Sequence, residues 1–436
     1  MMSQRPFPSG FLLEICLLLM LGAGACTPVG GDPNRIDGGN PDGGPGADGI
    51  VILDSTTMDK TPIAMAVGPS DRIGVAYFRN ATAPNFDIRY LEWKNGQVTT
   101  NESVQTVRRV EGVSVAFQPN GQPAVAYLGG GDDGTGSLYW VQSDAAISYR
   151  QQSGAWSESI AVRLSNEAYC GNPVSDNGFV VGLFPGLVFA GPTAYLVYRD
   201  VHQGQFPNQD WAGSDMEVVS GSPSSWTHTP VQCGGNDKQA YGGHVQVVLG
   251  AQNQPAVVSD KIFGSADGPG TSVLFHIRNS DSTWSNKPTG LTIGNTQWGA
   301  SLAYDSSLGY AIAVLDKTND ALFFTSSTDT NQWTTPDPVF QTGSGGWYPS
   351  VAIDPSTHEP NIAYYICSVR PGVVEGSCPA NENQLKITVR VLGNWRHSVI
   401  DPRGGIGPKL AFLSTGKRAI AYRDPISGGL KLFVEP

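Results

Sequence analysis

The sequence is a succession of short apolar runs separated by turns rich in Gly, Pro, Asn and Asp. The clearest recurring run reads Val-Ala-Tyr or Ile-Ala-Tyr, and each copy follows a turn and another short apolar run. Runs of this length, with β-branched and aromatic residues, indicate strands rather than helices. Close copies occur at 75–77, 125–127, 362–364 and 420–422.

Looser copies of the same pair of runs occur in the middle of the chain, so that seven units are expected. They lie at 187–198, 245–258 and 302–314. A third run follows in many units, for example at 138–141, 273–275 and 385–391. A last run then carries a Trp, at Trp156, Trp226, Trp284, Trp333 or Trp395. Four antiparallel strands per unit, repeated seven times, predict an all-β, seven-bladed β-propeller over residues 50–436.

The two ends of the repeat region predict how the ring closes. The last unit ends at 430–434 without a Trp run. The segment 50–54 precedes the first unit and resembles 398–401, which follows Trp395. We therefore expect the N-terminal strand to complete the last blade as its outer strand, which removes an open sheet edge.

Composition agrees with this fold and excludes several classes of function. The 54 Gly and 31 Pro among 436 residues argue against a helical bundle, and 40% hydrophobic residues argue against global disorder. The net charge of −11 comes without a Lys/Arg cluster, so we expect no nucleic-acid partner. Phosphate-binding loops and dinucleotide fingerprints are missing, so we expect no cofactor. We expect the protein to be a monomer.

The N-terminus predicts export and lipid anchoring. Residues 1–25 hold an apolar run followed by small residues, which is typical of a signal peptide. Ala23-Gly24-Ala25-Cys26 resembles a bacterial lipobox, in which Cys26 would carry the lipid; the alternative is an ordinary signal peptide with a coincidental Cys. Residues 26–49 are rich in Gly, Pro and Asp and predict a flexible tether. In the lipoproteins that this motif resembles, an Asp directly after the lipidated Cys is an inner-membrane retention signal. Thr27 stands there instead, which favours the outer membrane, at its periplasmic face or at the cell surface.

The four Cys that remain are an even number in an exported domain, which predicts two disulfides. Cys367 and Cys378 flank a Pro/Gly-rich segment. Cys170 and Cys233 lie on equivalent connections between strands in adjacent units. We predict the pairs Cys170–Cys233 and Cys367–Cys378. No ligand spacing for structural zinc occurs, so we expect no metal.

Charged residues recur at the end of the second strand of several units. In a propeller these positions lie on one face near the central channel, so they could form a polar binding site. The alternative is structural, because a loop Asp accepts backbone N–H groups and pairs with a neighbouring cation. His244 begins an inner strand near the same channel mouth, and Trp211, Trp298 and Trp347 are expected in loops. The candidates are Arg79, Arg199, Asp200, Asp260, Asp316, Arg423 and Asp424.

The units resemble the degenerate propeller repeats of the sialidase/BNR, or Asp-box, superfamily of exported bacterial proteins. Ser280-Asp281-Ser282-Thr283-Trp284 is a compressed Asp-box, and 327–333 lacks its Gly. The resemblance implies three Arg around a carboxylate, a Tyr activated by a Glu and an acidic Asp, and no Tyr/Glu pair can be named from spacing. We therefore predict an envelope propeller that binds a saccharide or a protein. The alternatives are a glycan-active hydrolase or lyase of sialidase type and a structural envelope component.

Overall fold

The computed structural model describes most of the repeat region, and all described residues belong to one compact unit, Gly38–Pro436. The predicted signal peptide, Cys26 and almost all of the predicted tether lie outside the described residues. No helix among the described residues is long and apolar enough to cross a membrane. The described ranges are 49–55, 62–82, 85–129, 144–162, 180–201, 214–233, 241–260, 273–291, 299–316, 320–373 and 377–436.

The strands form seven antiparallel four-stranded sheets, which confirms the predicted propeller. We number these blades in chain order. Blade 1 holds β2 (Ile63–Gly68), β3 (Arg72–Asn80), β4 (Phe86–Lys94) and β5 (Gln97–Val107). Blade 2 holds β6 (Val113–Phe117), β7 (Pro123–Gly129), β8 (Asp144–Arg150) and β9 (Trp156–Val162). Blade 3 holds β10 (Val180–Ala190), β11 (Thr193–Val201), β12 (Ser214–Ser222) and β13 (Ser225–Gln232).

The remaining blades have the same strand order. Blade 4 holds β14 (Gly243–Leu249), β15 (Pro255–Asp260), β16 (Val273–Arg278) and β17 (Trp284–Lys287). Blade 5 holds β18 (Ser301–Asp305), β19 (Gly309–Asp316), β20 (Ala321–Ser327) and β21 (Asp337–Phe340). Blade 6 holds β22 (Ser344–Ile353), β23 (Pro360–Ser368), β24 (Gln384–Val391) and β25 (Asn394–Asp401). Blade 7 holds β26 (Ile406–Phe412), β27 (Arg418–Arg423), β28 (Leu430–Val434) and β1 (Ile50–Asp54). Short 3-10 turns, η1 (Pro69–Asp71) and η3 (Ala251–Asn253), follow β2 and β14.

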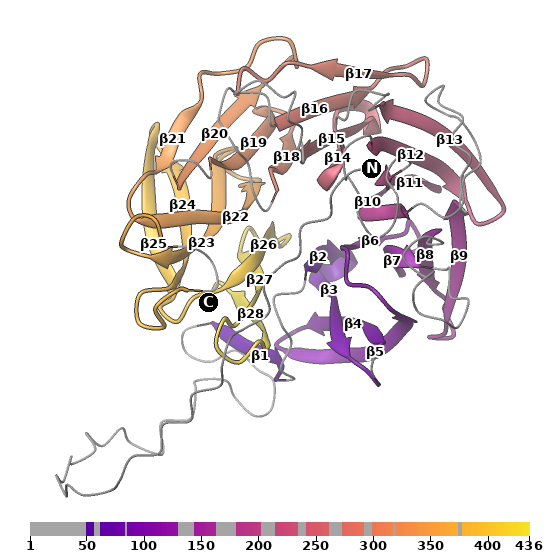
Figure 1. The fold of residues 1–436 in the computed structure, drawn as a ribbon, viewed down its shortest axis with the longest axis horizontal. Coiled ribbons are helices and arrows are strands. Elements are labelled where there is room, and N and C mark those ends of the chain that lie inside the picture. Colours follow the sequence, from indigo (N-terminus) through magenta and orange to yellow (C-terminus); the bar gives the residue numbers. More distant parts are fainter. Residues whose placement is uncertain are drawn as a thin grey trace, which may run out of the picture. The chain divides into compact units, whose positions relative to one another are not determined.

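The first strand of each blade lies at the centre of a ring, as Figure 1 shows. Each inner strand contacts the inner strand of the next blade, and β26 contacts β2 to complete the circle. The closing strand is β1, which pairs with β28 and places Val51 opposite Leu432. The prediction that the N-terminal strand completes the last blade is therefore confirmed.

Apolar faces of neighbouring blades pack against each other and form the core. The Tyr of each close Val-Ala-Tyr copy is buried there, and its hydroxyl finds a polar partner near an outer strand. Tyr77 donates to the Asp54 carboxylate at 2.6 Å, and Tyr127 donates to Glu158 at 2.7 Å. Buried tyrosines usually find such a partner because an unpaired hydroxyl is costly inside a protein.

Two details of the predicted repeat were wrong. The third strand of blade 2 is β8, Asp144–Arg150, and not 138–141, which lies outside the described residues. Trp347 is not a loop residue: it lies in β22 and is 1% exposed, in contact with a cluster that includes Leu315. Trp211 and Trp298 lie outside the described residues.

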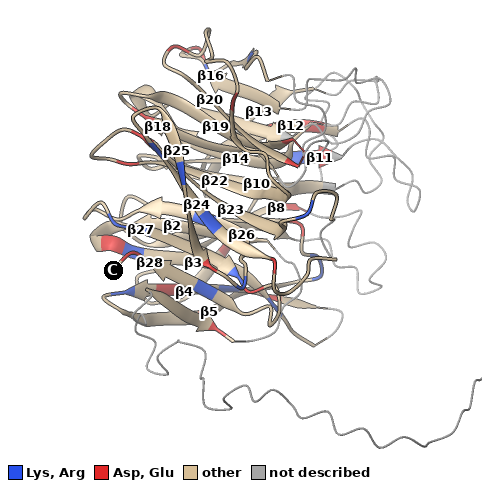
Figure 2. Ribbon diagram, turned by 90° about the vertical axis from the view of Figure 1, so that its left-hand side faces the viewer, with Lys and Arg blue, Asp and Glu red and all other residues tan. Residues whose placement is uncertain are grey.

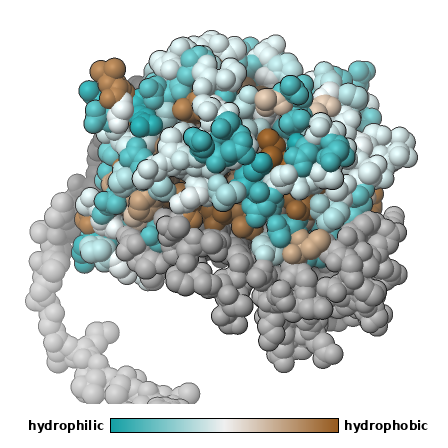
Figure 3. All heavy atoms as spheres, turned by 90° about the horizontal axis from the view of Figure 1, so that it is seen from above, coloured by the Kyte–Doolittle hydropathy of each residue, from teal (hydrophilic) through white to brown (hydrophobic). Residues whose placement is uncertain are grey.

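The predicted disulfide Cys367–Cys378 is present, with Cα atoms 4.9 Å apart. Cys233 is also disulfide-bonded, and its predicted partner Cys170 lies outside the described residues. Figure 2 shows basic and acidic residues interspersed on the side that it presents, and Figure 3 shows a mainly hydrophilic and neutral surface with small separate apolar patches.

Candidate functional site at the channel mouth

The inner strands of blades 3, 4, 6 and 7 each contain a β-bulge at the same place. In β10 the partners of Leu183 and Gly186 are Arg199 and Val197, so two residues face one. The pairings of β14, β22 and β26 shift in the same way. Bulges bend a strand and turn a side chain toward a new direction, and they are frequent beside functional sites.

The first residue of each bulge has a left-handed backbone, a conformation that favours Gly. Blade 7 has Gly407 there, with φ of 62°, but the other three blades have bulky rings. Phe184, His244 and Tyr348 have φ of 50°, 44° and 52°. Among the described residues, these are the three non-glycine residues with positive φ inside strands, and the others lie outside strands. A ring at such a position costs roughly 1 kcal/mol or more, so its retention indicates a function for the side chain.

All three rings line one cavity of about 290 Å³ at the channel mouth. The Phe184 and His244 rings lie 4.8 Å apart, centre to centre, with 38° between their planes. Blades 2 and 3 meet closely beside them: the Phe184 N–H donates to the Glu111 carbonyl at 2.9 Å. The mouth is therefore a mainly apolar recess with aromatic walls, the usual character of a small-molecule site.

Two charged side chains, Glu111 and Lys409, line the same cavity. Burial raises the pKa of the Glu111 carboxyl to about 7, although electrostatic interactions with Arg109 and His244 act in the opposite direction. Burial also lowers the pKa of the Lys409 amine to about 8. Perturbed groups of this kind in a recess are typical of functional sites.

The predicted charged candidates occupy the same end of the blades, yet none of them is among the described residues that line this cavity. Arg199 and Asp200 are buried at the end of β11, where the Arg199 Nε atom donates to the Ser214 hydroxyl at 2.8 Å. Burial lowers the pKa of Arg199 to about 9. Asp316 is buried at the end of β19, and Asp260 ends β15.

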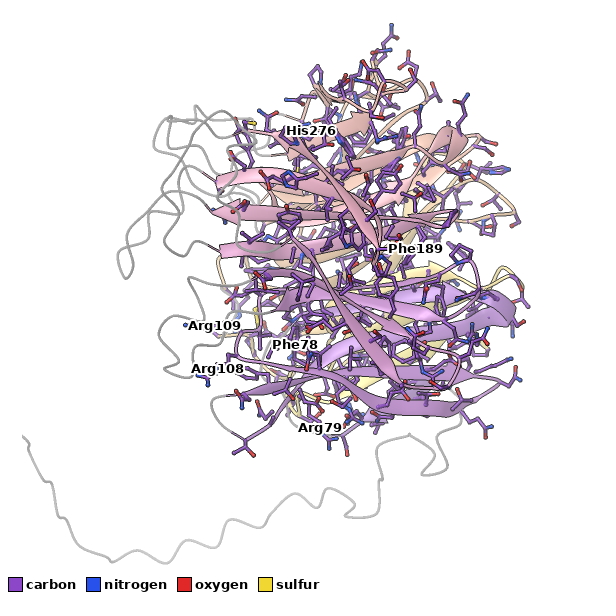
Figure 4. All side chains as sticks on the ribbon, turned by 90° about the vertical axis from the view of Figure 1, so that its right-hand side faces the viewer. Phe78, Arg79, Arg108, Arg109, Phe189 and His276 are labelled. Carbon is purple, nitrogen blue, oxygen red and sulfur yellow. A yellow bond between two sulfur atoms is a disulfide. The ribbon has the colours of Figure 1, made fainter. Side chains whose placement is uncertain are left out.

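The remaining candidates lie near the junction of blades 7 and 1. The Arg423 guanidinium donates to the Gly428 carbonyl at 3.1 Å, and Asp424 forms an ion pair with Lys431 at 2.6 Å. Arg79 is half-buried at the end of β3, further out than the adjacent Phe78, as Figure 4 shows. These contacts match the structural alternative, in which the charged side chains form hydrogen bonds and ion pairs within the fold. A binding role for the seven residues stays a prediction.

Sequence reasoning placed His244 at the mouth but missed the other wall residues. A signal was present, because the bulged strands begin with related four-residue phrases. These are Gly-Leu-Phe-Pro at 182–185, Gly-Gly-His-Val at 242–245, Gly-Trp-Tyr-Pro at 346–349 and Gly-Ile-Gly-Pro at 405–408. The phrase was overlooked because its Gly and Pro resemble ordinary turn residues, and the bulge breaks the alternation that marks a strand.

Comparisons with known proteins found propellers at low identity. An α-L-arabinanase from Penicillium chrysogenum is 12% identical over 88% of this chain and 97% of its own, with a TM-score of 0.46. An α-L-arabinofuranosidase from Fusarium graminearum is 11% identical over 89% and 97%, with a TM-score of 0.48. A Streptococcus pneumoniae sialidase is 9% identical over 88% and 70%, with a TM-score of 0.45. No protein family and no curated protein matched the sequence. At these levels the matches carry no information on substrate.

Proposed function

We propose that this protein is an exported propeller that binds a saccharide at the mouth of its central channel. The observation that supports this most directly is the convergence of Phe184, His244 and Tyr348 on one cavity, each held in a backbone conformation that favours Gly. Aromatic faces stack on the C–H faces of sugar rings, and nearby polar groups bind the hydroxyls. Glu111 and Gln246 supply such groups in the same wall.

A glycan array followed by calorimetry tests this proposal. The wild-type domain should bind a defined set of saccharides, and Phe184→Ala should lower the affinity about tenfold or more. Phe117→Ala is the matched control, because Phe117 ends the inner strand β6 away from the Val113 end that lines the mouth. If Phe184→Ala left saccharide binding unchanged, the binding site would lie outside this cavity. A complete lack of saccharide binding by the wild-type protein would refute the proposal.

A second candidate function is glycoside cleavage at the same cavity. The specific observation is Glu111, whose pKa of about 7 suits a general acid and which lines the same cavity as the Tyr348 ring. Most glycosidases use two carboxyl groups, and Glu111 is the one carboxylate among the described residues of this wall. Turnover of an aryl glycoside panel that Glu111→Gln abolishes would support cleavage, whereas binding without turnover supports the first candidate.

The location of the protein is a separate proposal. The lipobox-like Ala23-Gly24-Ala25-Cys26 supports a lipid on Cys26 that holds the domain at the outer membrane. A tether of the length of residues 26–49 spans roughly 25–30 Å as a flexible chain, enough to keep a folded domain clear of the lipid headgroups. Cys26→Ala should release the protein into the soluble fraction, and unchanged membrane association would refute the anchor.

A further inference from the structure

Seven equivalent positions, one on each inner strand, face the central channel. Each position pairs with the middle residue of the Val-Ala-Tyr run or its equivalent on the second strand of the blade. All seven residues line the channel cavity. In blade order they are Ala64, Ser114, Gly186, Gln246, Ser301, Ser350 and Lys409.

Four of these residues have the same structural task. Each side-chain oxygen accepts a hydrogen bond from the backbone N–H of the next inner strand and so links two blades. Ser114 accepts from Leu187 at 3.0 Å, Gln246 from Leu302 at 3.1 Å, Ser301 from Val351 at 2.9 Å and Ser350 from Leu410 at 2.9 Å. The position is therefore an acceptor position, or else it holds a small residue, as Ala64 and Gly186 do.

Lys409 cannot perform this task. An ammonium group has three donors and no acceptor, so it cannot receive the N–H of the next strand. The Lys409 ammonium has no hydrogen-bond or ion-pair partner among the described residues. Enclosure by the ring lowers its pKa to about 8, which means that the charged form is held there at a cost in free energy. The repeat therefore gives no structural reason for a lysine in blade 7.

The surroundings of Lys409 suit an anionic ligand. Lys409 lines both the mouth cavity and the channel below it, so a group that enters the mouth can reach its ammonium. The other ionisable residues in the described wall of the mouth are Glu111, His244 and Tyr348. The pKa of Glu111 responds to Arg109 and His244, whereas burial alone accounts for that of Lys409. Glu111 and Lys409 form no ion pair with each other.

We propose that Lys409 binds a carboxylate of the ligand, and that the preferred saccharides are therefore acidic ones that carry a uronic acid. This inference rests on the proposed saccharide function and adds the chemical class of the ligand. The sugar ring would lie against Phe184 and Tyr348, with its carboxylate directed down the channel to the ammonium. A charge-assisted hydrogen bond in a partly dehydrated channel is about twice as strong as a neutral one.

Calorimetry with matched acidic and neutral saccharides tests the inference. The probes are oligogalacturonides and other uronate oligosaccharides, each paired with its methyl ester, which removes the charge and keeps the sugar. The variant is Lys409→Ser, because Ser is the residue of blades 2, 5 and 6 and should preserve the fold. Lys417→Ser, at an exposed turn, controls for the loss of one positive charge.

We expect wild-type protein to prefer each uronate over its ester, and Lys409→Ser to lose roughly tenfold or more in affinity for the uronate only. Affinity for the uronate should fall as pH rises through about 8, because Lys409 loses its proton there, and affinity for the ester should not. This inference would be overturned if wild-type protein bound uronate and ester with equal affinity, or if wild type and Lys409→Ser bound the uronate equally well. Either result would leave the proposed saccharide binding in place. Binding of no saccharide would overturn both.

Discussion

The hydroxyl oxygen of Ser301 accepts a hydrogen bond of 2.9 Å from the backbone N–H of Val351, and this bond joins the inner strand of blade 5 to that of blade 6. Both residues are buried. Strands of neighbouring blades are not paired in a common sheet, so the bond supplies a directional link where otherwise only apolar packing acts. Equivalent bonds to Ser114, Gln246 and Ser350 join three further pairs of neighbouring inner strands.

Replacement of Ser301 by Ala should therefore destabilise the propeller. The change leaves the Val351 N–H without its side-chain acceptor, which costs about 1–2 kcal/mol for a buried donor. The measurement is the free energy of unfolding in denaturant. Ser224→Ala, at an exposed turn of blade 3, should change it by less than about 0.5 kcal/mol. Equal effects at the two sites would contradict a linking role for Ser301.

The fold could be predicted from the sequence because the same strand pattern recurs in each of the seven units. Each Val-Ala-Tyr run supports the others, and the resemblance of 50–54 to the run after Trp395 revealed the closing strand. Single elements without repeated support were less secure, as the displaced third strand of blade 2 shows. Trp347 was misplaced because it belongs to a bulge phrase, where the alternation of a regular strand is lost.

The site was harder to predict than the fold. Proximity to the channel was inferred correctly for the ends of the second strands, but the direction of a side chain was not available from spacing. Arg199 and Arg423 are buried in protein contacts, while the first strands supply the cavity wall. Lys409 becomes conspicuous only after pairing has aligned it with Ser301 and Ser350, since nothing near it in the sequence marks it as unusual.

Lys409→Ser should make the protein more stable at neutral pH. The pKa of Lys409 is lowered from 10.5 to about 8 in the folded protein, so the protonated amine disfavours folding at pH values below 8. A shift of this size corresponds to at most about 3 kcal/mol, and we expect a gain of about 1–3 kcal/mol at pH 7. The new hydroxyl can also accept the N–H of the next strand.

Denaturant unfolding at pH 7 and pH 10 measures this gain. The advantage of the Ser variant should shrink at pH 10, because Lys409 is neutral in the fold and is losing its proton in the unfolded chain as well. A variant that is less stable than wild type at both pH values would show that the ammonium has a stabilising contact. Loss of uronate binding together with a gain in stability would identify Lys409 as a residue retained for function.

His276 should make the fold sensitive to acid. This side chain of β16 is fully buried, and neither ring nitrogen has a hydrogen-bond partner among the described residues. Burial lowers the pKa of the imidazole from 6.5 to about 4. The unfolded chain therefore takes up a proton before the folded protein does, and stability falls as pH drops from about 6.5 to about 4, by at most roughly 3 kcal/mol.

The comparison of His276→Leu with wild type isolates this contribution. The difference in unfolding free energy between the two proteins should be constant above pH 7 and should change in favour of Leu between pH 6.5 and pH 4. A difference that does not depend on pH would mean that the pKa of His276 is the same in the folded protein as in the unfolded chain.

Tyr348→Gly should reveal the strain stored at the channel mouth. Glycine in a strand is normally about 0.5–1 kcal/mol less stable than alanine, but Tyr348 has a positive φ that favours Gly. We therefore expect the Gly variant to be about 1 kcal/mol more stable than Tyr348→Ala, a reversal of the usual order.

Unfolding free energies of the two variants and their saccharide affinities complete the test. Both variants remove the ring, so both should bind saccharide about tenfold or more weakly, whatever their stability. Relief of strain should offset much of the packing lost in Tyr348→Gly, so that this variant stays within about 1 kcal/mol of wild type. If alanine were the more stable of the two, the backbone at Tyr348 would not be strained. The ring would then need no functional reason to remain where blade 7 has Gly407.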